Sequence, residues 1–155
     1  MTRKAEKRDI PAIMELLRQV EEIHAEGRPD IFVHGGTKYT SGDVEKIIGS
    51  PITPVFVYEK ENAVLGYAFC VVNENGENGF LHKNKMLYID DICVDEKQRG
   101  KHIGTEIFNY VQSYAAENGF DSITLNVWSF NSAAMSFYEK MGMTPLKTVM
   151  EKKIK

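Results

Sequence analysis

A short polar turn combines positive charge with glycine where a helical pattern begins. Residues 99–104 read RGKHIG and follow the apolar, β-rich run of residues 87–94. The free N–H groups of a first helical turn and the helix dipole both favour a bound anion. Glycine allows close approach to the backbone because it has no Cβ. The turn therefore predicts a site for a phosphate group, although a purely structural turn would have the same composition.

The spacing of this turn excludes two common nucleotide-binding motifs. His102 stands where a P-loop requires Ser or Thr after Gly-Lys, and the upstream glycine of that motif is missing. The turn does not match the glycine fingerprint of dinucleotide-binding proteins either.

Two adjacent carboxylates, Asp90 and Asp91, lie inside the apolar run that precedes the turn. An unpaired carboxylate would be unfavourable in such surroundings. Neighbouring strand residues point to opposite faces, so only one of the two faces a cleft unless a β-bulge intervenes. One of them is a candidate base or anchor for a substrate amine, and the alternative is a pair of structural or surface carboxylates. Strand alternation does not decide between Asp90 and Asp91.

The hydrophobic pattern predicts one α/β domain, residues 1–155, with the element order β-α-α-β-β-β-α-β-α-β. The expected elements are a strand near residues 2–5, helices over about 9–25 and 41–48, strands at 55–58, 65–72 and 87–94, a helix over about 103–118, a strand at 122–128, a helix over about 131–141 and a last strand at 146–154. A turn at Glu61-Asn62 and a loop from Asn73 to Gly79 are expected between strands.

Composition and charge limit the classes of partner. The 155 residues carry a formal charge of −3, so we expect no nucleic-acid partner. No apolar run approaches the ~20 residues that span a bilayer, and the N-terminus lacks a signal-peptide pattern, so we expect a cytoplasmic protein without a membrane partner. Cys70 and Cys93 are expected to be buried thiols. His24, His34 and His82 have no metal-ligand spacing, and we expect no metal.

Residues 99–104, together with NSAAMSFYEKMGM at residues 131–143, resemble the GNAT superfamily of acetyl-CoA-dependent N-acetyltransferases. The family pattern at the first site is Gln/Arg-x-x-Gly-x-Gly/Ala. Arg99, Ile103 and Gly104 match it, but His102 replaces the usual middle glycine. The resemblance implies a GNAT-like fold, a mixed, mostly antiparallel central sheet flanked by helices.

The resemblance implies roles for particular residues toward acetyl-CoA as co-substrate. Backbone groups around Ile92, Cys93 and Val94 would pair with the pantetheine arm, and the Ile92 N–H would hold the thioester carbonyl. The pyrophosphate would lie against amides of Arg99, Gly100, Lys101, His102, Ile103, Gly104 and Thr105.

Two residues of the last predicted helix complete the implied site. Asn131 would contact the cofactor, although as a helix cap it also has a structural role. Tyr138 would protonate the departing CoA thiolate, and the alternative is an aromatic side chain packed on the sheet. Cys93 as an acyl-carrying nucleophile is disfavoured because no partnered base is evident, so direct attack in a ternary complex is expected.

The acceptor is predicted less sharply. The segment from Arg28 to Tyr39 is either an acceptor-binding wall or an ordered connector. The loop from Asn73 to Lys85 is a candidate for the other side of the entrance. A small-molecule amine is slightly favoured over a peptide amine, and a homodimer is common in the family. The alternatives are a non-catalytic acyl-CoA-binding regulatory module and an interaction protein without a cofactor.

Overall fold

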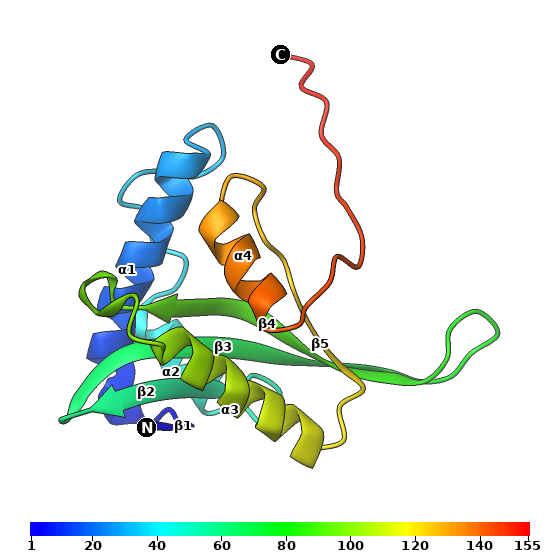
Figure 1. The fold of residues 1–155 in the computed structure, drawn as a ribbon, viewed down its shortest axis with the longest axis horizontal. Helices are drawn as coiled ribbons and strands as arrows, with labels where there is room; N and C mark the ends of the chain where they lie inside the picture. The colour runs from blue at the N-terminus through cyan, green and yellow to red at the C-terminus, as the bar shows by residue number, and fades with distance from the viewer.

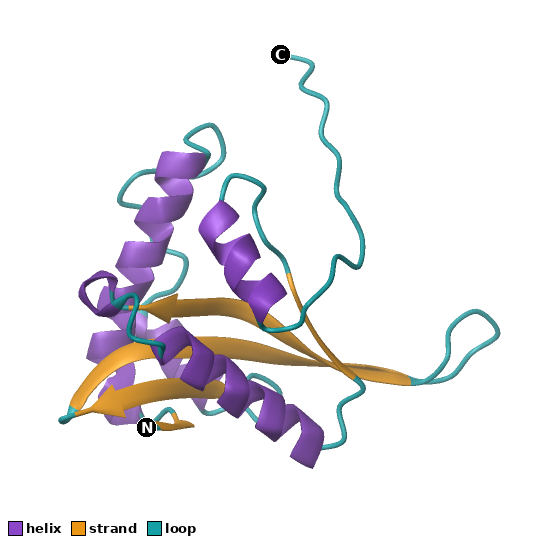
Figure 2. Cartoon of the chain, viewed as in Figure 1, coloured by secondary structure: helices purple, strands orange, loops and turns teal.

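The computed structural model describes residues 1–155 and contains one five-stranded sheet with helices on both faces (Figures 1 and 2). The strands are β1 (Thr2–Lys4), β2 (Val55–Lys60), β3 (Ala63–Asn75), β4 (Asn84–Val94) and β5 (Ser122–Leu125). The helices are α1 (Ile10–Gly27), α2 (Ser41–Ile48), α3 (Ile103–Glu117) and α4 (Ser132–Lys140), with short 3-10 turns at Lys7–Asp9 and Glu96–Gln98. The strand order is β1-β2-β3-β4-β5; only the β4–β5 pair is parallel.

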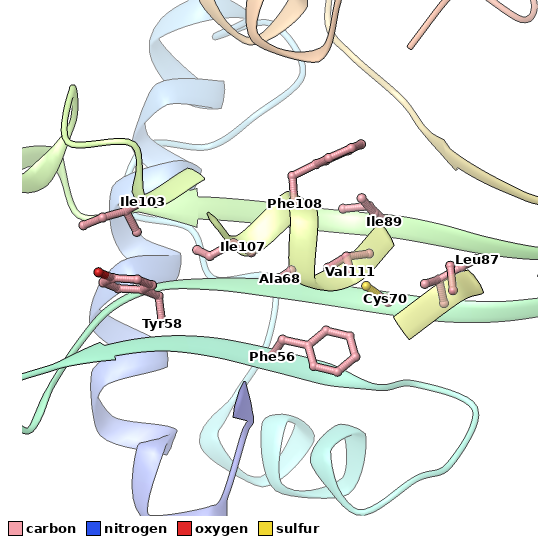
Figure 3. Packing of buried hydrophobic residues seen from close by; sticks show 11 residues of the cluster. Phe56, Tyr58, Ala68, Cys70, Leu87, Ile89, Ile103, Ile107, Phe108 and Val111 are labelled. Carbon is pink, nitrogen blue, oxygen red and sulfur yellow. The ribbon is translucent and has the colours of Figure 1, made fainter. Parts of the chain in front are cut away.

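The sheet separates two hydrophobic cores. On one face, α1 and α2 pack on β2, β3 and the end of β4 through Leu17, Val44 and Tyr67. On the other face, Ile107 and Val111 of α3 pack on Phe56 and its sheet neighbours (Figure 3). Side chains of α4 border this second core. Opposite faces of the same strands therefore serve different helices, as period-2 alternation predicts.

Local chemistry explains several element boundaries. Thr40 and Asp43 form a reciprocal capping box at the start of α2. Glu61 and Asn62 both have positive φ (51° and 62°), which closes the β2–β3 turn as predicted.

A β-bulge interrupts β4 at the two aspartates. Phe69 of β3 faces Asp91, while the next residue, Cys70, faces Ile89, so Asp90 has no partner in the register. Ile89 and Ile92 both contact the α3-side core, although an unbroken alternation would place them on opposite faces. The extra residue places both carboxylates on the α1 side of the sheet.

Some predicted boundaries were wrong. The strands β3 and β4 extend to Asn75 and from Asn84, which moves the expected Asn73–Gly79 loop to residues 76–83. The strand β5 ends at Leu125 rather than at residue 128. No helix in the structure has the length and apolarity needed to cross a bilayer.

The predicted last strand, residues 146–154, does not join the sheet. Residues 144–155 form an extended, exposed segment that leaves the end of α4 and runs away from β5 (Figure 1). Gly142, with φ +87°, turns the chain there. Ion pairs of Glu151 with Arg28 and of Lys153 with Asp30, both 3.1 Å long, direct the segment toward the loop after α1.

Candidate active site

The parallel strands β4 and β5 separate at the centre of the molecule. They pair only from Met86 to Ile89, opposite Ser122 to Leu125. There β5 ends, whereas β4 continues to Val94. The β4 edge along residues 90–94 is thus left without a neighbouring strand on that side. An extended ligand arm can hydrogen-bond to such an edge as an added strand would. This edge includes Ile92, Cys93 and Val94, the residues predicted for the pantetheine arm.

The turn before α3 presents a run of free backbone donors. No group of the chain accepts a hydrogen bond from the N–H groups of residues 99–105. Gly100 has φ +80°, and His102, in the left-handed conformation with φ 62°, immediately precedes the helix. His102 thus adopts a backbone conformation that suits the glycine usual at this place in the family. The N–H groups and the helix dipole together favour an anion here.

Gly104 connects this turn to α4. A Cβ built on Gly104 would lie 3.4 Å from Cζ of Phe137 and 3.7 Å from a methyl group of Val94. The absence of a side chain therefore lets Phe137 of α4 and Val94 of β4 pack closely against the start of α3.

Helix α4 positions two of the predicted residues. The Asn131 side chain accepts a hydrogen bond from the Ala134 N–H at 3.2 Å and caps the helix. Tyr138 packs beside Phe108 and Phe137, with ring centroids 6.4 Å and 5.3 Å away. Burial, with the nearby Asp91 charge, raises the pKa of Tyr138 and keeps its hydroxyl protonated. That hydroxyl makes no hydrogen bond within the chain.

The Asp91 carboxylate lies on the α1 side of the sheet and accepts a hydrogen bond from the Tyr67 hydroxyl. Burial raises the pKa of Asp91 to about 6, although the Tyr67 hydrogen bond and the Lys38 charge act in the opposite direction. Tyr67 is itself fully buried, and its pKa is raised well above the usual value, first by burial and then by the Asp91 charge. A carboxyl group with a pKa near neutrality can accept and release a proton at physiological pH.

Asp90 accepts hydrogen bonds from two residues of the loop after α1. Its Oδ2 lies 2.9 Å from Lys38 Nζ and 3.0 Å from the Tyr39 hydroxyl. Glu21 of α1 fixes this loop by accepting a hydrogen bond from the Lys38 N–H at 2.6 Å. Burial would lower the pKa of Lys38, but the Asp90 interaction outweighs it and the pKa is raised.

The sequence reasoning did not single out Lys38, Tyr39, Tyr67 or Glu21. Lys38 and Tyr39 lie within the loop predicted to bind the acceptor. Their ammonium and phenol groups were the only features of the sequence that could have indicated a role in the site. Tyr67 could have been found from its place on β3, because it shares a face with Phe69 and lies opposite Cys93.

The loop between α1 and α2 also contacts the loop between β5 and α4. Phe32 meets Trp128 edge to face at 5.2 Å, and Trp128 stacks with Phe130 at 6.2 Å. Phe130 in turn covers Gly27 at the end of α1. These aromatic contacts connect the predicted acceptor segment to the cofactor side of the molecule.

A groove of about 540 Å³ lies between α1, the following loop and the turn before α3. Four glutamates and two arginines contribute most of its polar lining: Glu21, Glu22, Glu26, Glu96, Arg18 and Arg99. Glu21 connects the groove to the carboxylate pair through the Lys38 loop.

Cys93 lacks the features of a nucleophile. The thiol is buried, and burial together with the Asp91 charge raises its pKa to about 12. Such a thiol stays protonated at neutral pH and does not form the reactive thiolate. Cys70 is likewise buried, and both cysteines are free, as predicted.

Comparisons with known proteins identify the family of this chain and its fold. The model of the acetyltransferase (GNAT) family matches residues 16–143. A thialysine N-epsilon-acetyltransferase of Bos taurus is 28% identical over 94% of this chain and 85% of its own length. A crystal structure of a mutant BH1408 protein from Bacillus halodurans has a TM-score of 0.95 at 30% identity. That match covers 99% of both chains and so includes the extended C-terminal segment.

The fold is shared more widely at lower identity. Aminoglycoside N-acetyltransferase AAC(6')-Iy in complex with CoA has a TM-score of 0.75 at 14% identity, covering 100% of this chain and 99% of that one. The family match, the full-length relatives and the split sheet with its donor-rich turn lead to one conclusion. This chain belongs to the GNAT family of acetyltransferases and is an acetyl-CoA-dependent N-acetyltransferase.

Proposed function

We propose that this protein transfers an acetyl group to a primary amine by direct attack in a ternary complex. The observation that carries the proposal is the β4 bulge, which places Asp90 and Asp91 on one side of the strand whose free edge begins at the same residues. Proton-accepting groups and a backbone edge able to hold a thioester thereby come together. Direct attack needs both, and no acyl-carrying nucleophile is required.

The chain's residues fit acetyl-CoA. The free N–H groups of residues 99–105 suit a pyrophosphate, and a Cβ on Gly100 would have no neighbour within 4 Å, so the backbone of the turn is accessible there. The open β4 edge at Ile92, Cys93 and Val94 suits the amide groups of a pantetheine arm, with the Ile92 N–H as donor to the thioester carbonyl. When bound, acetyl-CoA supplies the activated acetyl group.

Asp91 is the proposed base. An alkyl amine with a pKa of ~10.4 is only about one part in a thousand neutral at pH 7, so it must lose a proton before it attacks. A base with a pKa of about 6 is ionised at pH 7 and still accepts protons more readily than an ordinary aspartate. Asp91 would act directly or through one water molecule.

Asp90 is the proposed anchor for the acceptor. Its oxygen already holds an ammonium group, that of Lys38, at 2.9 Å. An incoming ammonium could replace Lys38 at the same oxygen, while the Tyr39 hydroxyl continues to orient the carboxylate. The nitrogen lone pair of the acceptor would become available to attack the thioester carbonyl only after Asp91 removes a proton from the ammonium group.

Tyr138 is the proposed donor to the departing sulfur. Its hydroxyl remains protonated and has no partner within the chain, so it is free to donate to a thiolate. A proton source at this position would stabilise the leaving group as the carbon–sulfur bond breaks.

The acceptor we favour is a small cationic amine rather than a peptide amine. The groove along α1, which Glu21 links to the Lys38 loop, carries four glutamates against two arginines, which favours positive charge. Two neighbours also act on small amine-bearing compounds, as the names thialysine N-epsilon-acetyltransferase and aminoglycoside N-acetyltransferase state. We further propose that the protein is a homodimer.

A non-catalytic acyl-CoA-binding module is less well supported. That alternative would gain weight if both aspartates pointed away from the acceptor loop. Instead, Asp90 contacts Lys38 and Tyr39 of that loop, and Asp91 lies within the influence of the Lys38 charge.

A screen of amines with release of the CoA thiol as the readout tests the proposal. We expect turnover with diamines, aminoglycosides or amino acids carrying a side-chain amine, and weaker turnover with peptides. Tight acetyl-CoA binding without turnover on any amine would contradict the proposal and support the binding module. A thermal shift with CoA, measured on the same samples, separates these results from a failure to bind cofactor.

A further inference from the structure

A lysine of the chain itself lies at the position proposed for the acceptor amine. Lys38 Nζ is 2.9 Å from Oδ2 of Asp90, so an ammonium group already rests against the proposed anchor. No other lysine pairs with Asp90 or Asp91. A lysine side chain ends in a primary alkyl amine, the class of group that the proposed reaction consumes. Lys38 therefore has the chemistry of an acceptor as well as its position.

The backbone that carries Lys38 is held from two sides. Glu21 of α1 accepts a hydrogen bond from the Lys38 N–H at 2.6 Å. The next residue, Tyr39, stacks on Phe69 of β3 with ring centroids 5.8 Å apart and donates its hydroxyl to Asp90 at 3.0 Å. These contacts position the start of the Lys38 side chain, whereas its four-carbon stem is intrinsically flexible. A fixed backbone and a movable stem thus bring the amine to the carboxylates.

The groups proposed for acetyl transfer lie within reach of that stem. Asp91, the proposed base, follows Asp90 directly, and the proposed donor to the thioester carbonyl is the N–H of the next residue, Ile92. Two residues of an extended strand span only about 7 Å. The bulge in β4 places both carboxylates on the side of the sheet where the Lys38 loop lies. Rotation of the stem can therefore carry Nζ from Asp90 to the carbonyl without displacing the loop.

We propose that Lys38 is an acetylation site that the protein's own transfer centre modifies. This inference rests on the acetyl transfer proposed above. Asp91 removes a proton from the Lys38 ammonium group, and the nitrogen then forms a bond to the acetyl carbon while the carbon–sulfur bond breaks. The sulfur keeps the electron pair of that bond and takes a proton from Tyr138, and the second proton lost by the nitrogen restores the Tyr138 hydroxyl. The products are acetyl-lysine, the CoA thiol and one proton, so no further reactant is needed.

The reaction on Lys38 ends after one acetyl group. Acetylation removes the positive charge of a lysine side chain. The acetylated side chain no longer forms an ion pair with Asp90, and its amide nitrogen is not a nucleophile. The anchor oxygen is then free for the ammonium group of a separate acceptor. Modification of Lys38 therefore opens the acceptor site.

Side-chain exposure distinguishes this reaction from unassisted acetylation by acetyl-CoA in solution. The Lys38 side chain is 47% exposed, whereas those of Lys7 and Lys153 are 76% and 62% exposed. A reagent that acts from solution reaches the more exposed amines more often. Unassisted acetylation should therefore favour Lys7 and Lys153, and only catalysis by the transfer centre should favour Lys38.

Mass spectrometry of the full chain incubated with acetyl-CoA, without any added amine, tests the site. Peptide mapping should find one acetyl group per chain at Lys38 before Lys7 or Lys153 is modified. The rate constant should be independent of chain concentration, as a reaction within one molecule requires. Asp91→Asn should slow the modification about 100-fold, because the base is lost. Lys38→Arg, which keeps a cation beside Asp90, is the matched control and should take up no acetyl group. Circular dichroism confirms that both variants are folded.

The amine screen on the same samples separates failure of this inference from failure of the proposed function. Turnover of an added amine while Lys38 stays unmodified would overturn the self-acetylation alone. Absence of both reactions would overturn the transfer chemistry as well. Equal modification of Lys7 and Lys153, or an undiminished rate in Asp91→Asn, would mean unassisted acetylation and would overturn the inference. A rate constant proportional to chain concentration would mean transfer between copies and would overturn it too.

Discussion

The two sides of the β4 edge offer different chemical groups to their ligands. On the cofactor side, the proposed contacts are backbone groups: the free edge of residues 90–94 and the N–H groups of residues 99–105. On the acceptor side, the contacts are side chains, with Lys38 and Tyr39 from one loop meeting Asp90 of the strand. A ligand held by backbone depends on the fold, whereas one held by side chains depends on individual residues. Substitutions should therefore change acceptor chemistry readily and cofactor affinity little.

Replacement of Asp91 by Asn should separate the two sides most strongly. We expect kcat/KM for the acceptor to fall about 10²- to 10³-fold, because the base is lost while the amide can still accept the Tyr67 hydrogen bond. The dissociation constant of acetyl-CoA, measured by calorimetry, should change less than about twofold. Asp90→Asn is the matched control and should act mainly on KM. A large loss of acetyl-CoA affinity in Asp91→Asn would contradict the assignment of Asp91 to the acceptor side alone.

Replacement of Tyr138 by Phe tests a side-chain role on the cofactor side. The ring packing against Phe108 and Phe137 is retained, so the fold should be preserved. We expect kcat to fall about 10- to 100-fold with acetyl-CoA affinity nearly intact, because only the proton source is lost. Steady-state kinetics with the best acceptor provide the measurement, and unchanged turnover would refute the role as donor.

The acid limb of the pH profile should report Asp91. The base works only when ionised, so kcat should rise as the pH increases through about 6. The Lys38 charge lowers the pKa of Asp91, so Lys38→Met should raise it and move the limb upward by about half a pH unit. The variant should then lose about twofold more activity at pH 6 than at pH 8. Lys60→Met is the control; a limb that moves equally there, or not at all in Lys38→Met, would exclude this coupling.

The smallest effect is expected at His102. Its left-handed conformation is unfavourable by about 1–2 kcal/mol for a residue with a Cβ. Glycine removes this strain but adds roughly 0.5–1 kcal/mol of chain entropy to the unfolded state. His102→Gly should therefore stabilise the protein by up to about 1 kcal/mol in urea unfolding. Acetyl-CoA affinity should stay within about threefold, and the same holds for His102→Ala. A tenfold loss in His102→Ala would show that the imidazole itself binds the cofactor.

Local features of the sequence predicted most of the cofactor side. Glycine, a helix start and a capping asparagine depend on neighbouring residues, so the turn and Asn131 lie where the sequence placed them. The choice between Asp90 and Asp91 was open because a bulge is a property of two strands. Lys38 could not be paired with Asp90 because 52 residues separate them in the chain.

The last strand shows a second limit of sequence reasoning. Alternation over residues 146–154 indicates that the segment can cover a sheet edge. It does not indicate whether that edge belongs to the same molecule, and here the segment lies apart from its own sheet. The predicted strand at residues 146–154 was therefore wrong.

Titration of the ¹⁵N-labelled protein with acetyl-CoA tests the central claim most directly. That claim is that free backbone donors before α3 hold the pyrophosphate while the open β4 edge holds the arm. We predict the largest amide shift changes at residues 99–105 and 92–94, with small changes in β1 and β2. Saturation with the largest changes elsewhere, and none at residues 99–105, would contradict the account.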